Sequence, residues 1–145
     1  MKMIYYDLLK KSVEDVRFDS EDFEKNVLYL PDIFNLLANL LDEEIIIQED
    51  RMLLNCALAY VVVPSDVIPE EVYGAKGFMD DLYVCCVVIK ELYKKYPELM
   101  RKHWNNTVDE EEFDKVWDKC YDDSEQACDE ENIKDKILKY AGLAP

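Results

Sequence analysis

The feature that most limits the fold is a pair of strongly apolar segments separated by a stretch with several prolines, glycines and acids. Residues 52–63 and 82–89 are apolar on nearly all sides of a helix, which is typical of helices at the centre of a domain. Between them, Pro64 cannot continue the first helix, and Pro69 favours an extended conformation for the residue before it. We therefore expect a buried helical hairpin, two central helices that a sharp turn joins.

Helical spacing dominates the other segments as well. Apolar residues recur at the i, i+3, i+4 and i+7 positions that form one face of a helix. The valines at 61–63 have a high strand propensity, but the chain offers them no alternating partner strand, so we assign them to the preceding helix. The isoleucine run 45–47, within residues 42–50, is left unassigned. The predicted helices are residues 4–17, 33–41, 52–63, 82–96, 113–121 and 130–141, the last closed by Gly142 at C′.

Chain length predicts a single domain. The chain has 145 residues, a size at which one hydrophobic core is usual, and it contains no internal repeat and no Gly/Ser-rich linker. We therefore expect an all-α fold, in which residues 1–145 form one compact domain of about six helices around the buried central hairpin.

The chain is strongly acidic, with 33 Asp and Glu residues against 17 Lys and Arg residues and a formal net charge of −16. Such a chain repels phosphate backbones, so we expect no nucleic acid partner. Its longest apolar run is well short of the about 20 residues of a transmembrane helix, so we expect no membrane span. Five cysteines without a C-x-x-C pair indicate reduced thiols, and the N-terminal residues do not resemble a signal peptide. These observations predict a soluble cytoplasmic protein.

Four carboxylates lie in or next to the stretch that joins the apolar segments: Asp66, Glu70, Asp80 and Asp81. Each has a structural role available, because acids near a helix N-terminus cap backbone N–H groups and oppose the helix dipole. Their oxygen atoms would also suit a divalent cation such as Mg²⁺, Mn²⁺ or Ca²⁺. We favour the structural role and keep a metal site of these four residues as the alternative. No other cofactor is expected.

The segment A-Y-V-V-V-P-S-D-V-I-P-E-E-V-Y-G-A-K-G-F-M-D-D-L, residues 59–82, resembles the signature of the YkvA-like family, a domain of unknown function. The family pattern reads A-Y-L-L-S-P-x-D-L-I-P-D, then a glycine, then an aromatic residue and D-D-L. Val63 replaces the usual serine, and the spacing between the second proline and the glycine is slightly longer here. The resemblance implies a helical hairpin at about residues 52–93 and no particular reaction. The matching motif and hinge residues include Tyr60, Pro64, Asp66, Pro69, Gly77, Asp80 and Asp81.

Other kinds of catalytic site have few residues to draw upon. His103 is the only histidine, which disfavours zinc sites and histidine-based triads, and we interpret it as an exposed residue at a helix end. Cys85 and Cys86 have apolar neighbours and no basic residue that would lower a thiol pKa, so we interpret them as buried thiols. The chain lacks a glycine-rich phosphate loop. The sequence leaves open whether the protein is an enzyme and favours a non-catalytic role.

The stretch from Glu98 to Asp135 is the most acidic part of the chain, with 14 acidic and 5 basic residues and a net charge of −9. Such a surface is either merely solvated or docks a basic partner, because complementary potentials speed encounter and reject wrong partners. The sequence thus favours a protein-interaction or regulatory module with a basic protein partner. The alternative is a metal-dependent enzyme or sensor that uses the hinge carboxylates.

Overall fold

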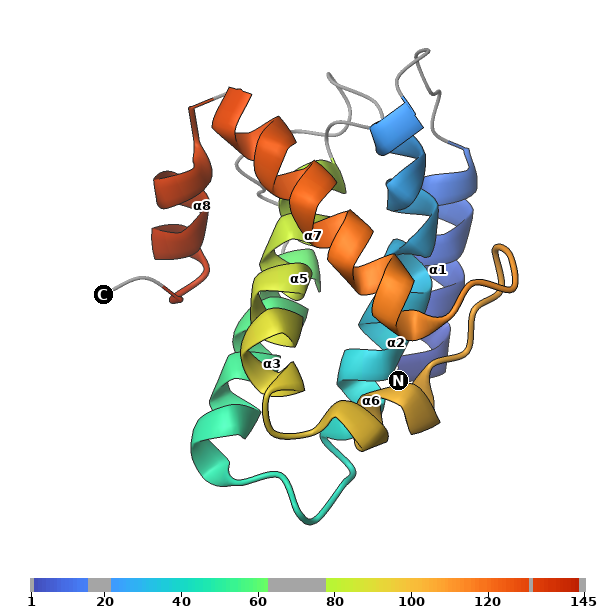
Figure 1. Ribbon diagram of the computed structural model, residues 1–145, viewed down its shortest axis with the longest axis vertical. Coiled ribbons are helices and arrows are strands. Elements are labelled where there is room, and N and C mark those ends of the chain that lie inside the picture. Colours follow the sequence, from blue (N-terminus) through green and yellow to red (C-terminus); the bar gives the residue numbers. More distant parts are fainter. Residues whose placement is uncertain (1, 16–21, 63–77, 131, 144–145) are drawn as a thin grey trace.

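The computed structural model describes residues 2–15, 22–62, 78–130 and 132–143, and over these residues the fold is all-α, as expected (Figure 1). It contains seven α-helices and one 3-10 helix there, so the expected number of about six helices was too low. The elements are α1 (Lys2–Glu14), η1 (Asp22–Tyr29), α2 (Leu30–Leu40), α3 (Gln48–Val62), α5 (Met79–Tyr93), α6 (Pro97–His103), α7 (Phe113–Glu130) and α8 (Lys134–Tyr140).

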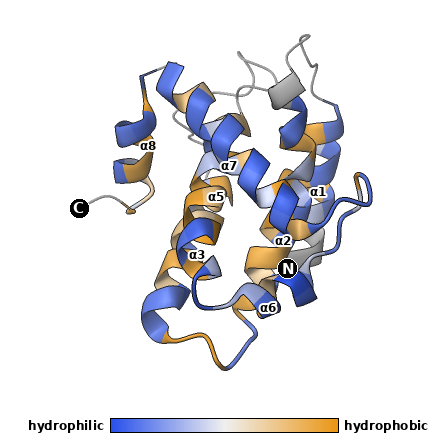
Figure 2. Cartoon of the chain, viewed as in Figure 1, coloured by the Kyte–Doolittle hydropathy of each residue, from blue (hydrophilic) through white to orange (hydrophobic). Residues whose placement is uncertain are grey.

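Helix α5 lies at the centre of the fold. Eleven of its fifteen residues are buried, and it packs most extensively against α7 and α3 (Figure 1). Figure 2 shows that its ribbon is mostly hydrophobic, whereas the hydrophilic side of α7 faces the viewer. Helices α3 and α5 form the hairpin that the apolar segments predicted, and α5 is the more deeply buried of the two.

Helix α2 completes the core, and α1 packs against its other side. Nine of the eleven residues of α2 are buried, including the leucines Leu36, Leu37 and Leu40. Pro31 lies in the first turn of α2, where its missing N–H group leaves no hydrogen bond unmade. The apolar spacing of this segment predicted helix α2. The spacing exists because the apolar side chains of the helix are buried in the core.

The isoleucine run belongs to the turn that connects α2 to α3. Ile46 is buried, whereas Ile45 is 66% exposed and Ile47 is 50% exposed. Arg51, in the first part of α3, donates hydrogen bonds to the backbone carbonyls of Leu41, Glu43 and Ile46. One guanidinium group therefore holds this connection in place, and the β-branched residues do not form a strand.

The C-terminal helices begin and end at different residues from those expected. Helix α7 runs on to Glu130, and α8 begins only at Lys134. Asn132, between them, has a positive φ of 58°, a left-handed conformation that interrupts a helix and that Asn tolerates better than most residues. Gly142 has a φ of 81° directly after the C-cap residue Ala141, so the predicted C′ position is confirmed.

Helix α3 is buried on one side only. Its inner side includes Asp50, Leu54, Ala57 and Val61, but its outer side is open, contrary to our expectation of an apolar helix covered all round. Across the described residues, none of the helices is long and apolar enough to cross a lipid bilayer.

Candidate functional site

The two aspartates of the D-D-L motif are buried at the start of α5. Asp80 is 0% exposed and Asp81 is 1% exposed, and both lie in the first turn of the helix. The N-cap residue is Phe78, which makes no side-chain capping bond, so neither aspartate is the N-cap itself. The positive end of the helix dipole stabilises both carboxylates at these positions.

Tyr60 reaches these carboxylates from the opposite arm of the hairpin. Its hydroxyl group donates a hydrogen bond of 2.7 Å to Oδ2 of Asp80, and its ring lies edge-on to that of Tyr140, with 6.0 Å between the centroids. The contact links the end of α3 to the start of α5. Two of the motif residues, Tyr60 and Asp80, are thus in direct contact.

The other motif residues lie outside the described part of the chain. These are Pro64, Asp66, Pro69 and Gly77, and the candidate metal ligand Glu70 lies outside it as well. Among the described residues, no group of three or more His, Cys, Asp or Glu side chains could hold a metal ion. Asp80 and Asp81 are carboxylate oxygen donors, the class that Mg²⁺, Mn²⁺ and Ca²⁺ prefer, and a cation site would need the two hinge acids beside them.

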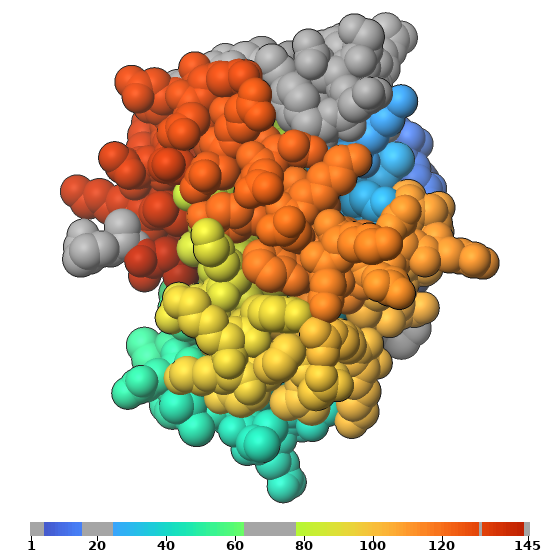
Figure 3. All heavy atoms as spheres, in the orientation of Figure 1, coloured from blue at the N-terminus to red at the C-terminus, as the bar shows by residue number. Residues whose placement is uncertain are grey.

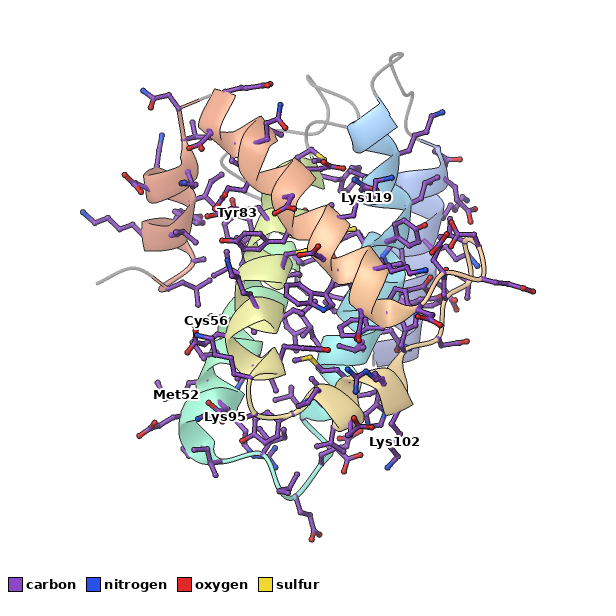
Figure 4. All side chains as sticks on the ribbon, viewed as in Figure 1. Met52, Cys56, Tyr83, Lys95, Lys102 and Lys119 are labelled. Carbon is purple, nitrogen blue, oxygen red and sulfur yellow. The ribbon has the colours of Figure 1, made fainter. Side chains whose placement is uncertain are left out.

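Two further buried aspartates accept hydrogen bonds from tyrosine. Asp50, 4% exposed, accepts one of 2.6 Å from the Tyr96 hydroxyl and pairs with Lys95, which is labelled in Figure 4. The hydrogen bond to Asp50 raises the pKa of both Tyr96 and Lys95. The contact ties the first turn of α3 to the chain after α5. A tyrosine therefore supplies a donor to each of three buried carboxylates in a chain short of cations.

Asp32 is the third of these carboxylates, and it anchors the loop before α7. It is 3% exposed and accepts hydrogen bonds from the Tyr6 hydroxyl, at 2.9 Å, and from the backbone N–H and hydroxyl groups of Thr107. Sequence patterns did not indicate this role, because the partners of Asp32 are 26 and 75 positions away. The one sequence signal for this role is the presence of ten tyrosines in so acidic a chain, because each tyrosine hydroxyl can donate a hydrogen bond to a carboxylate.

The loop that Asp32 anchors presents four consecutive acids, Asp109 to Glu112, all exposed. Trp104 and Asn106 donate hydrogen bonds to the Glu111 carbonyl, which fixes the loop backbone. Tyr29 donates a hydrogen bond to Asp109, and this bond lowers the pKa of the Asp109 carboxyl group. The acids are therefore held on an ordered loop.

Helix α7 adds three exposed acids to those of the loop, with the exposed Lys115 and Lys119 between and beside them. Asp118, Asp122 and Asp129 follow one another at helical spacing, and all three are exposed. Figure 3 shows α7 and the loop before it crossing the front of the molecule. We call Asp109 to Glu112 together with Asp118, Asp122 and Asp129 the acidic surface.

The remaining candidates from the sequence have structural roles. None of the five cysteines forms a disulfide, and burial raises the pKa of the Cys85 and Cys86 thiols, which disfavours the reactive thiolate. His103 ends α6, but its side chain is only 21% exposed and its Nε2 lies 2.7 Å from Oε1 of Glu43. The expectation of an exposed histidine was therefore wrong, because Glu43 of the α2–α3 connection covers it.

Comparison with known proteins identifies the hairpin. Residues 50–86, which include all but the first two residues of α3, the segment after it and the first half of α5, match a family described as "Protein of unknown function (DUF1232)". This match confirms the resemblance found in the sequence, for that segment of the chain.

Two relatives share part of the chain. The uncharacterized protein ORF9 of Methanothermobacter thermautotrophicus is 40% identical over 79 residues, which are 54% of this chain and 54% of that protein. The E3 ubiquitin-protein ligase RNF170 of Xenopus laevis is 41% identical over 44 residues, which are 30% of this chain and 17% of the ligase. The matched part of the chain thus spans about half of the first relative and much less of the second. No solved structure matches the chain.

Proposed function

We propose that this protein, whose residues 50–86 match a family of unknown function, is a non-catalytic module that binds a basic protein partner through its acidic surface. The observation that carries the proposal is the exposure of seven carboxylates on one ordered loop and one side of α7. An electrostatic surface of this kind raises the rate of encounter with a partner of opposite charge and rejects acidic ones. The five cysteines without a disulfide support a reducing compartment, so we expect to find the partner in the cytoplasm.

The ordered loop supports the proposal because a fixed surface loses little conformational entropy on binding. Thr107, bonded to Asp32, holds one side of the loop. Arg101 holds the other, with a bidentate pair to Asp114 at 2.9 and 3.2 Å. The hydrogen bonds from Arg101 lower the pKa of Asp114, which keeps this carboxylate ionised. The exposed glutamates of the loop, Glu110 to Glu112, are then available to a partner.

The test is capture of partners from the native host by the immobilised protein, with mass spectrometry of what is retained. In a first variant Glu110, Glu111 and Glu112 are replaced by Lys. We expect this variant to lose the basic proteins that the unaltered protein retains, because three charges of the loop are reversed. Its thermal stability should change little, since exposed substitutions away from caps and core usually cost within about 0.5 kcal/mol.

The matched control reverses three exposed acids outside the acidic surface, Asp7, Glu44 and Glu91. It changes the net charge by the same amount but leaves the loop intact. Retention by the control and loss by the loop variant would locate binding at the loop. Equal loss in both variants would mean that net charge alone attracts the basic proteins, and undiminished capture by the loop variant would refute the proposal.

A divalent cation at Asp66, Glu70, Asp80 and Asp81 is the second candidate, and the burial of two adjacent carboxylates favours it. Burial of a charge is costly unless hydrogen bonds or an opposite charge compensate it. Tyr60 and the helix dipole already contribute here, so the cation would add to an existing arrangement. In this reading the protein is a metal-dependent enzyme or sensor.

A further inference from the structure

The outer side of α3 is exposed and yet carries no charge. The helix has no charged residue from Met52 to Val62, although 34% of all residues in the chain are charged. Met52 is 60% exposed and Val62 is 49% exposed, and Asn55 and Ala59 are exposed between them. In an acidic protein, an uncharged and largely apolar exposed helix face is typical of an interface.

A groove of about 520 Å³ lies between this side of α3 and the end of α8. Met52 and Cys56, one turn apart on α3, line one wall, and both are labelled in Figure 4. Tyr140, 57% exposed, belongs to the other wall. Gly142, just after α8, lies beside Cys56, because a Cβ atom built at this residue would be 3.6 Å from the Cys56 sulfur, an ordinary contact distance. The groove is thus a mostly apolar cavity that lies next to the exposed, uncharged side of α3.

Exposed residues of opposite charge lie one helical turn before residues that line this groove. Glu49 is exposed and precedes Met52 by three residues, so both lie on the same side of α3. Lys136 is exposed and precedes Tyr140 by four residues, so both lie on the same side of α8. We propose that a second copy of this chain occupies the groove, with the two α3 helices antiparallel about a two-fold axis.

The antiparallel arrangement follows from the order of residues along α3. With the axis beside Asn55 and Cys56, Met52 of one copy lies opposite Ala59 of the other, a large side chain against a small one. Glu49 of one copy then approaches Lys136 of the other. The two-fold axis makes both contacts twice, which is the self-complementarity that a closed dimer requires.

Charge also selects this side of the molecule for self-association. Two copies, each with a net charge of −16, repel one another over most of their surfaces. The uncharged stretch from Met52 to Val62 lets the backbones approach without placing like charges in contact. The acidic surface lies on α7 and its loop, so this inference does not depend on the proposed function.

The first test is sedimentation equilibrium of the purified full chain at about 1 to 100 µM, a range in which a dimer of micromolar Kd dissociates. We expect a mass of twice the 17.1 kDa of one chain at the upper concentrations. Ala59→Arg should give a monomer throughout, and Gln126→Arg, an equal change on an exposed position of α7, should leave the dimer intact. Circular dichroism confirms that both variants are folded.

The second test exchanges the charges of Glu49 and Lys136. Glu49→Lys and Lys136→Glu should each weaken the dimer about tenfold, because every substitution acts twice in a two-fold interface. The variant with both substitutions should regain the affinity of the unaltered chain. Glu49→Lys lowers the net negative charge, which would by itself favour association, so a weakening cannot come from net charge.

The third test uses Cys56, which lies close to the proposed axis and is the only cysteine that is not fully buried. A short bismaleimide should link two copies through Cys56, and Cys56→Ser should abolish the covalent dimer. A chain that stays monomeric at all these concentrations, or a dimer that Ala59→Arg leaves intact, overturns the proposal. Failure of the double charge exchange to restore affinity refutes the antiparallel pairing.

Discussion

Replacing Tyr60 by Phe would remove one hydroxyl group and leave the ring in place between the two arms of the hairpin. That hydroxyl donates a hydrogen bond of 2.7 Å to Asp80, whose side chain is completely buried. A hydrogen bond to a charged group contributes about 1.5–3 kcal/mol, and a buried carboxylate that loses a donor retains its desolvation cost. We therefore expect Tyr60→Phe to lower the free energy of unfolding by about 2 kcal/mol.

The assay is urea denaturation followed by far-ultraviolet circular dichroism, with the m-value expected to stay unchanged. The melting temperature should fall by about 5–10 °C for a domain of this size. The matched control is Tyr121→Phe, whose hydroxyl bonds to a half-buried Glu125 at 3.0 Å and should cost about 0.5–1 kcal/mol.

A double variant separates the pair from its surroundings. Asp80→Asn should cost less in the Tyr60→Phe background than in the unaltered chain, because the two residues share one interaction. Losses that simply add, or a Tyr60→Phe variant no less stable than Tyr121→Phe, would refute the structural role assigned to this contact.

Three other predictions concern stability. Burial and the hydrogen bond to Glu125 raise the pKa of Tyr121 to about 12 from 10.0. The contribution of Tyr121 to the free energy of unfolding is therefore complete below pH 10 and is lost as the pH rises toward 12. Urea denaturation at alkaline pH should show this fall, and Tyr121→Phe should reduce it. Arg51→Lys should lower the free energy of unfolding by about 2 kcal/mol in the same assay, because an ammonium group cannot span three carbonyls as the guanidinium does. Melting curves with chelator and with millimolar Mg²⁺, Mn²⁺ or Ca²⁺ should coincide if the hinge acids only stabilise the backbone. A rise in melting temperature that Asp66→Asn, Asp80→Asn and Asp81→Asn each remove would instead establish the cation site.

The sequence predicted the features that depend on local chemistry. The apolar spacing identified α2, α5 and the first half of α7, and the glycine at position 142 marked the end of α8. Val61 and Val62 were rightly assigned to α3, where Val61 is buried and Val62 is half exposed, and Val63 lies outside the described residues. Each of these features is decided within a few residues of the chain.

Contacts between distant residues were not visible in the sequence. Asp50 and Tyr96 are 46 positions apart, and nothing in the spacing around either residue indicates the other. The exposure of the outer side of α3 was also missed. An apolar helix has the same sequence pattern whether its second face is covered by its own chain or exposed to a second protein. The hydrogen bonds of Arg51 could not be predicted for the same reason. Its three carbonyl partners come close to it only because the chain turns between α2 and α3.

The measurement that tests the proposed function most directly is cross-linking of a captured basic partner by a carbodiimide, which joins carboxylates to lysine amines without a spacer. Mass spectrometry then locates each linked residue. Binding through the acidic surface predicts links from Glu110, Glu111 and Glu112 and from Asp118 and Asp122 of α7. Links confined to acids elsewhere, such as Glu44 and Glu91, would contradict it.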